Sequence, residues 1–122
     1  MKRLAAIVLL LLGAGCRTPR SGTREDGFID EGKASFYGQS LQGRPTASGE
    51  RFDKEALTAA HRELPLGTCV RVENPKTGRS VKVRINDRGP FSGGRIIDVS
   101  ERAARELGMV QTGVAWVKLY KC

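Results

Sequence analysis

The feature that most constrains this chain is the run from residue 81 to residue 100, where two apolar segments each lead to an aspartate. Valine and isoleucine alternate with basic residues over 81–85, which predicts a strand with one buried face. An Asn-Asp-Arg-Gly-Pro turn sequence ends this strand and leaves Asp87 at its mouth. After two glycines, residues 95–99 form a second predicted strand that carries Asp98. Two isolated turn aspartates would only cap backbone amides, so the rest of the chain must decide their role.

The remaining predicted strands are short and closely spaced. They lie at residues 32–37, 69–73 and 114–120, and a Pro-Lys-Thr-Gly turn at 75–78 makes a hairpin of the second one with 81–85. Residues 41–52 are rich in Gly, Pro, Thr and Ser, which predicts a loop. Such spacing favours a closed barrel of about six strands, because closure removes exposed strand edges.

One or two short helices complete the predicted fold, which is mainly β. Ser100 as N-cap, Glu101 in the first turn and Gly108 after the last turn bracket a helix of about two turns. Asp53 can cap a second helix over residues 54–57.

The N-terminus has the composition of an export signal. Lys2 and Arg3 precede the apolar run 4–12, which is followed by small residues and Cys16. The apolar run is too short to span a bilayer comfortably, so it fits a signal peptide better than a membrane helix. Cys16 resembles the lipidated cysteine of a bacterial lipobox. The alternative is ordinary cleavage nearby, which would leave a soluble protein with a spare thiol.

Three segments follow from this interpretation. We expect a lipoprotein signal peptide at 1–15, a lipidated N-terminus and flexible tether at 16–31, and a folded domain at 32–122. The tether has mixed charges and too little apolar content for a core. Because Arg17 follows the cysteine, and not the aspartate that retains many lipoproteins at the inner membrane, we expect a lipid anchor on the periplasmic face of the outer membrane.

The charge balance is basic. Removing Lys2 and Arg3 reduces the 21 basic residues to 19, against 13 acidic residues, which leaves a net charge of +6. A basic surface is either simply solvated or suited to an anionic polymer, such as nucleic acid or a glycan with lactyl carboxylates. Export favours the glycan, so no nucleic-acid partner is expected.

Two cysteines remain for the folded domain once Cys16 is assigned to lipid. An even pair in an exported domain predicts a disulfide between Cys69 and Cys122. Two cysteines and a single histidine, without a short Cys-x-x-Cys spacing, make a poor zinc site. We therefore expect neither a metal nor another cofactor.

Five motifs follow one another along the chain, at residues 32–38, 43–50, 57–61, 64–68 and in the run around Asp87. Together they resemble the rare lipoprotein A family of septal-ring and cell-wall lipoproteins. The resemblance runs from residue 32 to the C-terminus. It implies a six-stranded double-psi β-barrel that acts as a lytic transglycosylase on peptidoglycan glycan strands, with division proteins as further partners.

The resemblance also implies three catalytic positions. Asp87 matches the essential aspartate, and Glu50 and His61 match two further implicated residues. Lytic cleavage needs a group that protonates the leaving oxygen and then takes the proton of the C6 hydroxyl, and one carboxylic acid can do both. We expect Asp87 to be that group, Glu50 to stabilise the cationic sugar or assist proton transfer, and His61 to hydrogen-bond a carboxylate or the glycan. Without the resemblance, Glu50 would be interpreted as a surface carboxylate and His61 as a packed loop histidine.

Candidate substrate-binding residues lie near these positions. Tyr37 and Phe36 are predicted sugar platforms and Arg88 a carboxylate-binding residue, with core packing and solvated charge as the alternatives. Asp98 is expected to cap the helix region near Ser100, or to line the cleft.

Three functions are compatible with these residues. The first is an endolytic lytic transglycosylase that prefers peptide-poor strands and leaves 1,6-anhydroMurNAc ends. The second is a non-catalytic, expansin-like wall-binding lipoprotein. The third is an ordinary hydrolase, in which Glu50 and Asp87 act as a carboxylate pair with water between them.

Overall fold

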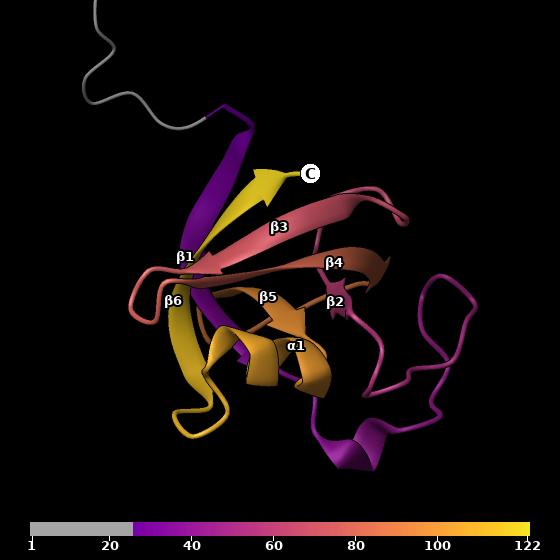
Figure 1. The fold of residues 1–122 in the computed structure, drawn as a ribbon. Coiled ribbons are helices and arrows are strands. Elements are labelled where there is room, and N and C mark those ends of the chain that lie inside the picture. Colours follow the sequence, from indigo (N-terminus) through magenta and orange to yellow (C-terminus); the bar gives the residue numbers. More distant parts are fainter. Residues whose placement is uncertain (1–25) are drawn as a thin grey trace, which may run out of the picture.

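Six strands close into a barrel in the computed structural model of the chain, which describes residues 26–122. Around the barrel the strand order is β1-β5-β2-β4-β3-β6, with one helix packed outside (Figure 1). The bounds are β1 Phe28–Phe36, β2 Thr58–Ala60, β3 Cys69–Asn74, β4 Arg79–Asp87, β5 Arg95–Val99, α1 Glu101–Leu107 and β6 Val114–Lys121. The predicted mainly β barrel of six strands is confirmed.

The barrel mixes parallel and antiparallel pairs. β1 pairs with β5 and β2 pairs with β4 in parallel, while the other neighbouring pairs are antiparallel. Parallel partners cannot be joined by a tight hairpin, so long connections cross the ends of the barrel. One such connection, residues 37–57, lies between β1 and β2 and covers the end at which β4 finishes.

Alternating side chains fill the barrel, as the sequence pattern predicts. Val81, Val83 and Ile85 of β4 are buried, and the residues between them, Lys82 and Arg84, are exposed. The inward residues of β3 and β6 join the same core, together with the apolar face of α1. Burial of these apolar side chains is the main force that holds the short strands together.

The predicted ends of α1 are confirmed. The Ser100 side chain accepts a hydrogen bond from the backbone N–H of Ala103, and Gly108 adopts the left-handed conformation with φ of 73°. Gly108 then donates to the carbonyl of Ala104, which satisfies a group at the end of the helix.

The N-terminal boundary of the barrel differs from the predicted one. β1 begins at Phe28, so residues 28–31, assigned to the tether, belong to the barrel. The Phe28 ring packs edge-on against Tyr120 at 5.8 Å between ring centroids, an anchor that local composition does not reveal. Cys16 and the signal peptide lie outside the described residues.

The helix predicted over residues 54–57 is wrong. Asp53 does accept from the N–H of Glu55, but the segment makes only a turn. The Lys54 carbonyl accepts instead from the backbone N–H of Arg102 in the first turn of α1. Tertiary packing therefore uses a carbonyl that a helix would need for its own hydrogen bonds. The second helical element is a single 3-10 turn, η2, at Gln39–Leu41.

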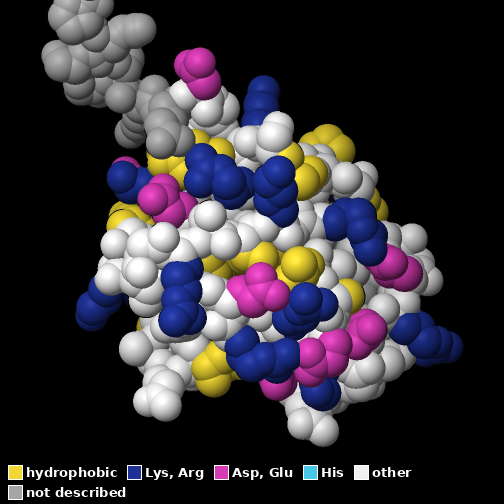
Figure 2. Space-filling view, in the orientation of Figure 1, with side chains coloured by type: hydrophobic (Ala, Val, Ile, Leu, Met, Phe, Trp, Pro, Cys, Tyr) yellow, Lys and Arg dark blue, Asp and Glu magenta, His cyan; other side chains and the backbone are white. Residues whose placement is uncertain are grey.

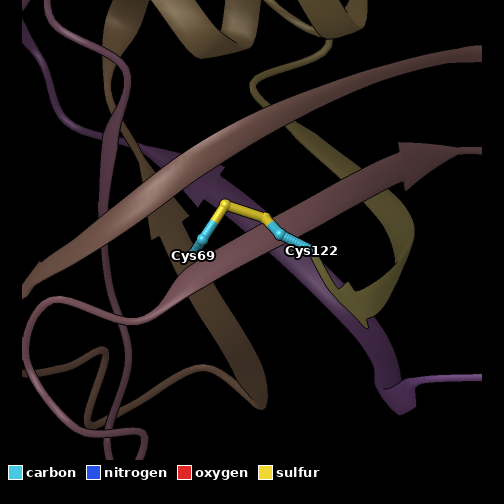
Figure 3. Close-up of a disulfide and its surroundings, with 2 residues drawn as sticks. All are labelled: Cys69 and Cys122. Carbon is cyan, nitrogen blue, oxygen red and sulfur yellow. A yellow bond between two sulfur atoms is a disulfide. The ribbon is translucent and has the colours of Figure 1, made fainter.

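The predicted disulfide is confirmed. Cys69 and Cys122 are joined with their Cα atoms 5.5 Å apart, which ties the start of β3 to the C-terminal residue (Figure 3). The bond closes a loop across a sequence separation of 53 residues. In the chain-entropy model a loop of that length is worth about 4 kcal/mol.

Candidate active site

Asp87 stands at the C-terminal end of β4, and each of its carboxylate oxygens has defined donors. Oδ1 accepts from the backbone N–H groups of Ala47 and Arg88, both at 2.9 Å. Oδ2 accepts from the Tyr37 hydroxyl at 3.0 Å. The two amides fix the side chain through Oδ1, and the donor to Oδ2 is a side-chain hydroxyl.

Two further contacts hold Tyr37 in position for this hydrogen bond. Its backbone N–H donates to the carbonyl of Val99, and its ring meets the buried ring of Phe52 edge-on at 4.8 Å between centroids. Burial, followed by the charge of Asp87, raises the pKa of the Tyr37 hydroxyl well above its ordinary value. The phenol therefore keeps its proton and remains available as a donor to Asp87.

A pocket of about 290 Å³ opens beside these two side chains. Besides Tyr37 and Asp87, the residues that line it are Leu41, Arg44, Pro45, Thr46 and Phe52, all from the connection between β1 and β2. This connection is fastened to the barrel where Ser48 donates its backbone N–H to the carbonyl of Asn86. The pocket thus combines an apolar wall, a guanidinium and the Asp87 carboxylate.

Glu50 lies on the same connection but outside the pocket lining. Its carboxylate receives two hydrogen bonds from the Arg84 guanidinium, at 2.6 and 3.3 Å, and one from the Asn86 amide at 3.0 Å. The Arg84 hydrogen bond, more than any other contact, lowers the pKa of Glu50. Glu50 is therefore ionised at neutral pH, which suits a stabiliser of positive charge and not a general acid.

His61 is adjacent to Asp87 through its backbone. Its N–H donates to the carbonyl of Asp87 at 3.1 Å, while ring Nδ1 accepts from the N–H groups of Glu63 and Leu64, both at 3.1 Å. Nδ1 is thus the unprotonated nitrogen, and Nε2 carries the proton in the neutral ring. The side chain is buried, and burial lowers its pKa. These contacts show the ring fastening a turn, as the packed-histidine alternative predicts.

The other candidates divide between the pocket and its support. The Arg88 guanidinium donates to the carbonyls of His61 and Leu64, at 3.1 and 2.7 Å, so it braces the 61–64 turn. Phe36 packs against the barrel core. Of the three predicted substrate-binding residues, Tyr37 alone is among those that line the pocket.

Asp98 does not cap α1, so that prediction is wrong. Its Oδ1 accepts from the Ser35 hydroxyl and from the Arg95 guanidinium, the latter at 3.0 Å. The cap is supplied by Ser100 itself. The β1–β5 register, which places Ser35 opposite Asp98, decides the role of this carboxylate.

Sequence reasoning missed Arg44 and Thr46 as pocket residues and Arg84 as the partner of Glu50. The first two lie within the 43–50 motif, which was a usable signal for the pocket wall. Arg84 is 34 residues from Glu50 in sequence, and its alternation with buried residues indicated only an exposed position on β4.

The described residues offer neither a metal centre nor a membrane helix. Between residues 26 and 122, no group of three or more His, Cys, Asp and Glu side chains is arranged to hold a metal ion. Within the same range, no helix has the length and apolar character needed to cross a bilayer.

Comparison with known proteins identifies the family. The model of a double-psi β-barrel family described as lytic transglycolase matches residues 29–119. The chain belongs to this lytic transglycolase family. Within it, the chain is 64% identical over 91 residues to a probable endolytic peptidoglycan transglycosylase RlpA of a Nostoc species. It is 54% identical over 102 residues to an endolytic peptidoglycan transglycosylase RlpA of Neisseria meningitidis. The resemblance to rare lipoprotein A is confirmed.

These RlpA relatives are longer proteins. The match covers 73% of this chain and 24% of the Nostoc protein, and 84% of this chain and 42% of the Neisseria protein. The chain therefore spans less than half the length of either relative.

Two solved structures of other proteins show the same fold. A Streptomyces papain inhibitor matches with a TM-score of 0.60 and 21% identity, over 79% of this chain and 97% of its own. A Clavibacter michiganensis expansin matches with a TM-score of 0.59 and 24% identity, over 75% of this chain and 49% of its own. Similarity at this level establishes the shared barrel, and the predicted double-psi fold is confirmed.

Proposed function

We propose that this chain is an endolytic lytic transglycosylase domain that cleaves the MurNAc–GlcNAc bonds of peptidoglycan. The observation that carries the proposal is the placement of Asp87, which lines the pocket with Oδ1 fixed by two amides and Oδ2 contacted by Tyr37. The activity named for the RlpA relatives supports the same reaction class.

In this reaction a single carboxyl group acts first as a general acid and then as a general base. Protonated at Oδ2, Asp87 donates its proton to the GlcNAc O4 as the bond from this oxygen to C1 of MurNAc breaks. The carboxylate so formed takes the proton of the MurNAc C6 hydroxyl, whose oxygen attacks C1 and closes the 1,6-anhydro ring. Asp87 ends protonated, water is not consumed, and the group is ready for another cycle.

Neighbouring residues support these steps without transferring the proton themselves. The Tyr37 hydroxyl rotates to accept from a protonated Oδ2 or donate to an ionised one, so it holds the carboxyl in position in both states. Glu50, kept ionised by Arg84, supplies negative charge that favours the cationic sugar. His61 and Arg88 keep the 61–64 turn beside β4.

Product analysis by mass spectrometry tests the proposal. Peptidoglycan and isolated glycan strands are incubated with the purified chain, with the Asp87→Asn variant as the matched control. We expect 1,6-anhydroMurNAc ends from the wild type and faster release from peptide-poor strands. Reducing ends would instead indicate a hydrolase. Binding without any released product would support the expansin-like alternative, which shares the barrel fold.

We also propose that Cys16 carries the lipid that anchors the protein to the periplasmic face of the outer membrane, where division proteins would be its partners. The support is the sequence pattern that ends at Cys16. Membrane fractionation of wild type and Cys16→Ala checks this, since only the wild type should sediment with membranes. A Cys16→Ala protein that still sediments would contradict it.

A further inference from the structure

A second groove, of about 740 Å³, shares no lining residue with the Asp87 pocket. Its walls come from β1, the 75–77 turn of the β3–β4 hairpin, the 108–112 loop after α1 and the start of β6. Figure 1 shows this hairpin and the loop before β6 on the same side of the barrel. We call this surface the Trp116 groove.

Trp116 dominates the groove as an exposed aromatic surface. Its side chain is 56% exposed, and Val114, two residues earlier on β6, is 46% exposed. The indole N–H donates to the Glu31 carboxylate at 3.3 Å, which restrains the ring orientation. Large exposed aromatic residues beside a concave surface are typical of binding sites, because covering them with a ligand removes apolar area from water.

The charged residues that line the groove indicate which class of ligand it fits. Lys33 lies opposite Trp116 in the β1–β6 register, and Lys76 extends from the hairpin turn. Among the described residues that line the groove there is no aspartate or glutamate, and the nearby Glu31 carboxylate already accepts the indole N–H. A groove that combines an exposed aromatic ring with two lysines suits a polymer that has apolar ring faces and carboxylates together.

We infer that the Trp116 groove is a second binding surface for a carboxylate-bearing glycan, which holds one segment of the strand while the Asp87 pocket acts on another. The apolar C–H face of a sugar ring would stack on Trp116, and lactyl carboxylates would pair with Lys33 and Lys76. The inference rests on the proposed function for the identity of the polymer.

The position of the groove fits this use. β1 carries Lys33 and leads directly into Tyr37, so at ~3.3 Å per residue the two positions are roughly 13 Å apart along the chain. Two sites on one rigid barrel bind a long polymer more tightly than either alone, because binding at the first raises the effective concentration at the second. On the face that Figure 2 shows, basic side chains are spread out with acidic side chains among them, so that face offers only a diffuse attraction to an anionic polymer.

The chain supplies its own probe, because Trp116 is its single tryptophan. The full chain carrying Asp87→Asn, which prevents cleavage, is titrated with long peptide-free glycan strands while tryptophan emission is followed. We expect a saturable emission change, and a dissociation constant about tenfold higher when Lys33 and Lys76 are both replaced by Gln. Neutral chitin oligosaccharides, which lack the carboxylate, should bind like the double variant.

Kinetics of otherwise wild-type chains provide the second readout. Trp116→Ala should raise the KM for long strands about tenfold and leave cleavage of short fragments unchanged, whereas Trp116→Phe should stay near wild type. Phe91→Ala is the matched control, since Phe91 is 76% exposed and is not among the groove residues.

The outcomes separate this inference from the proposed function. If the wild type cleaves long strands but the tryptophan emission of Asp87→Asn does not change on titration, the groove is not a glycan-binding surface, and the lytic activity is unaffected. The same conclusion follows if wild type and Trp116→Ala have equal KM for long strands. A saturable emission change in the Asp87→Asn chain, together with no product released by the wild type, would support the groove and refute the lytic activity. Self-association lost in Trp116→Ala, with glycan affinity unchanged, would show a protein interface and overturn the inference.

Discussion

Asp87 and Asp98 occupy equivalent levels of the barrel in different surroundings. Both pair with Ala60 of β2, Asp87 from β4 on one side and Asp98 from β5 on the other. Asp87 lines the pocket and receives hydrogen bonds from two backbone amides and the Tyr37 hydroxyl. The carboxylate of Asp98 is bound to the Arg95 guanidinium and the Ser35 hydroxyl.

Two aspartates at the same level of one barrel thus have different hydrogen-bond partners, and this difference underlies the roles proposed for them. Asp98 is held in an ion pair with Arg95, whereas Oδ2 of Asp87 has a neutral hydroxyl as its donor and the residue lines the pocket. We therefore expect the acid/base role at Asp87 and a structural role at Asp98. Four substitutions test this comparison.

Asp87→Asn should have the largest effect. The amide keeps the size of the carboxylate but cannot donate and recover the catalytic proton, so turnover should fall by about 10²–10⁴-fold. Product release measured by mass spectrometry checks the rate, and circular dichroism with glycan pull-down checks that folding and binding persist. A variant that cleaves at the wild-type rate would end the assignment of Asp87 as acid/base.

Glu50→Gln should have an intermediate effect. Glu50 resembles Asp98 in its ion pair with an arginine, yet it also binds Asn86, the residue before Asp87. Loss of its negative charge should lower turnover about tenfold with little change in glycan affinity. The same assay, run beside Asp98→Asn, gives the comparison. Equal turnover in wild type and Glu50→Gln would reduce Glu50 to a structural role.

Sequence periodicity could predict those elements that have one buried face and one exposed face. β4 alternates buried and exposed residues, and β5 was predicted with its observed bounds because turn residues flank it. β2 was not predicted as a strand, since it has only three residues and all are buried. A fully buried segment of that length carries no alternation by which it could be recognised.

For the candidate site, the sequence could indicate which residue types carry the chemistry but not which distant residues contact them. Asp87 was identified from a motif, but the contact that orients Oδ2 comes from Tyr37, 50 residues earlier. Asp98 was assigned to the nearby helix because local capping is visible in sequence, whereas Ser35, its partner across the β1–β5 register, is 63 residues away. Closure of the barrel creates these contacts, so no local pattern contains them.

Asp98→Asn should affect stability more than turnover. The substitution removes the charge that balances the half-buried Arg95, which should cost about 1–3 kcal/mol of unfolding free energy. Turnover per folded molecule should stay within about threefold of wild type. Urea denaturation measures the first quantity and product release the second. A folded but inactive Asp98→Asn protein, beside an active Asp87→Asn protein, would exchange the roles of the two aspartates.

The smallest expected effect is the pH dependence of stability at His61, which follows Ala60 and donates its backbone N–H to the carbonyl of Asp87. Burial lowers the pKa of His61 below its ordinary value of about 6.5. The unfolded chain therefore binds a proton at a higher pH than the folded chain, and the unfolding free energy falls as pH decreases through about 6.5.

Because His61 is the only histidine in the chain, His61→Gln is a clean test. The Gln side-chain oxygen can still accept from a backbone amide, but it does not titrate. Urea unfolding between about pH 7.5 and pH 5.5 should show a decline in the wild type that is shallower in the variant, with carboxylates contributing equally to both. Parallel curves would mean that His61 is protonated as easily in the folded barrel as in the unfolded chain. The turn beside Asp87 would then be held by Arg88 and not by the neutral imidazole.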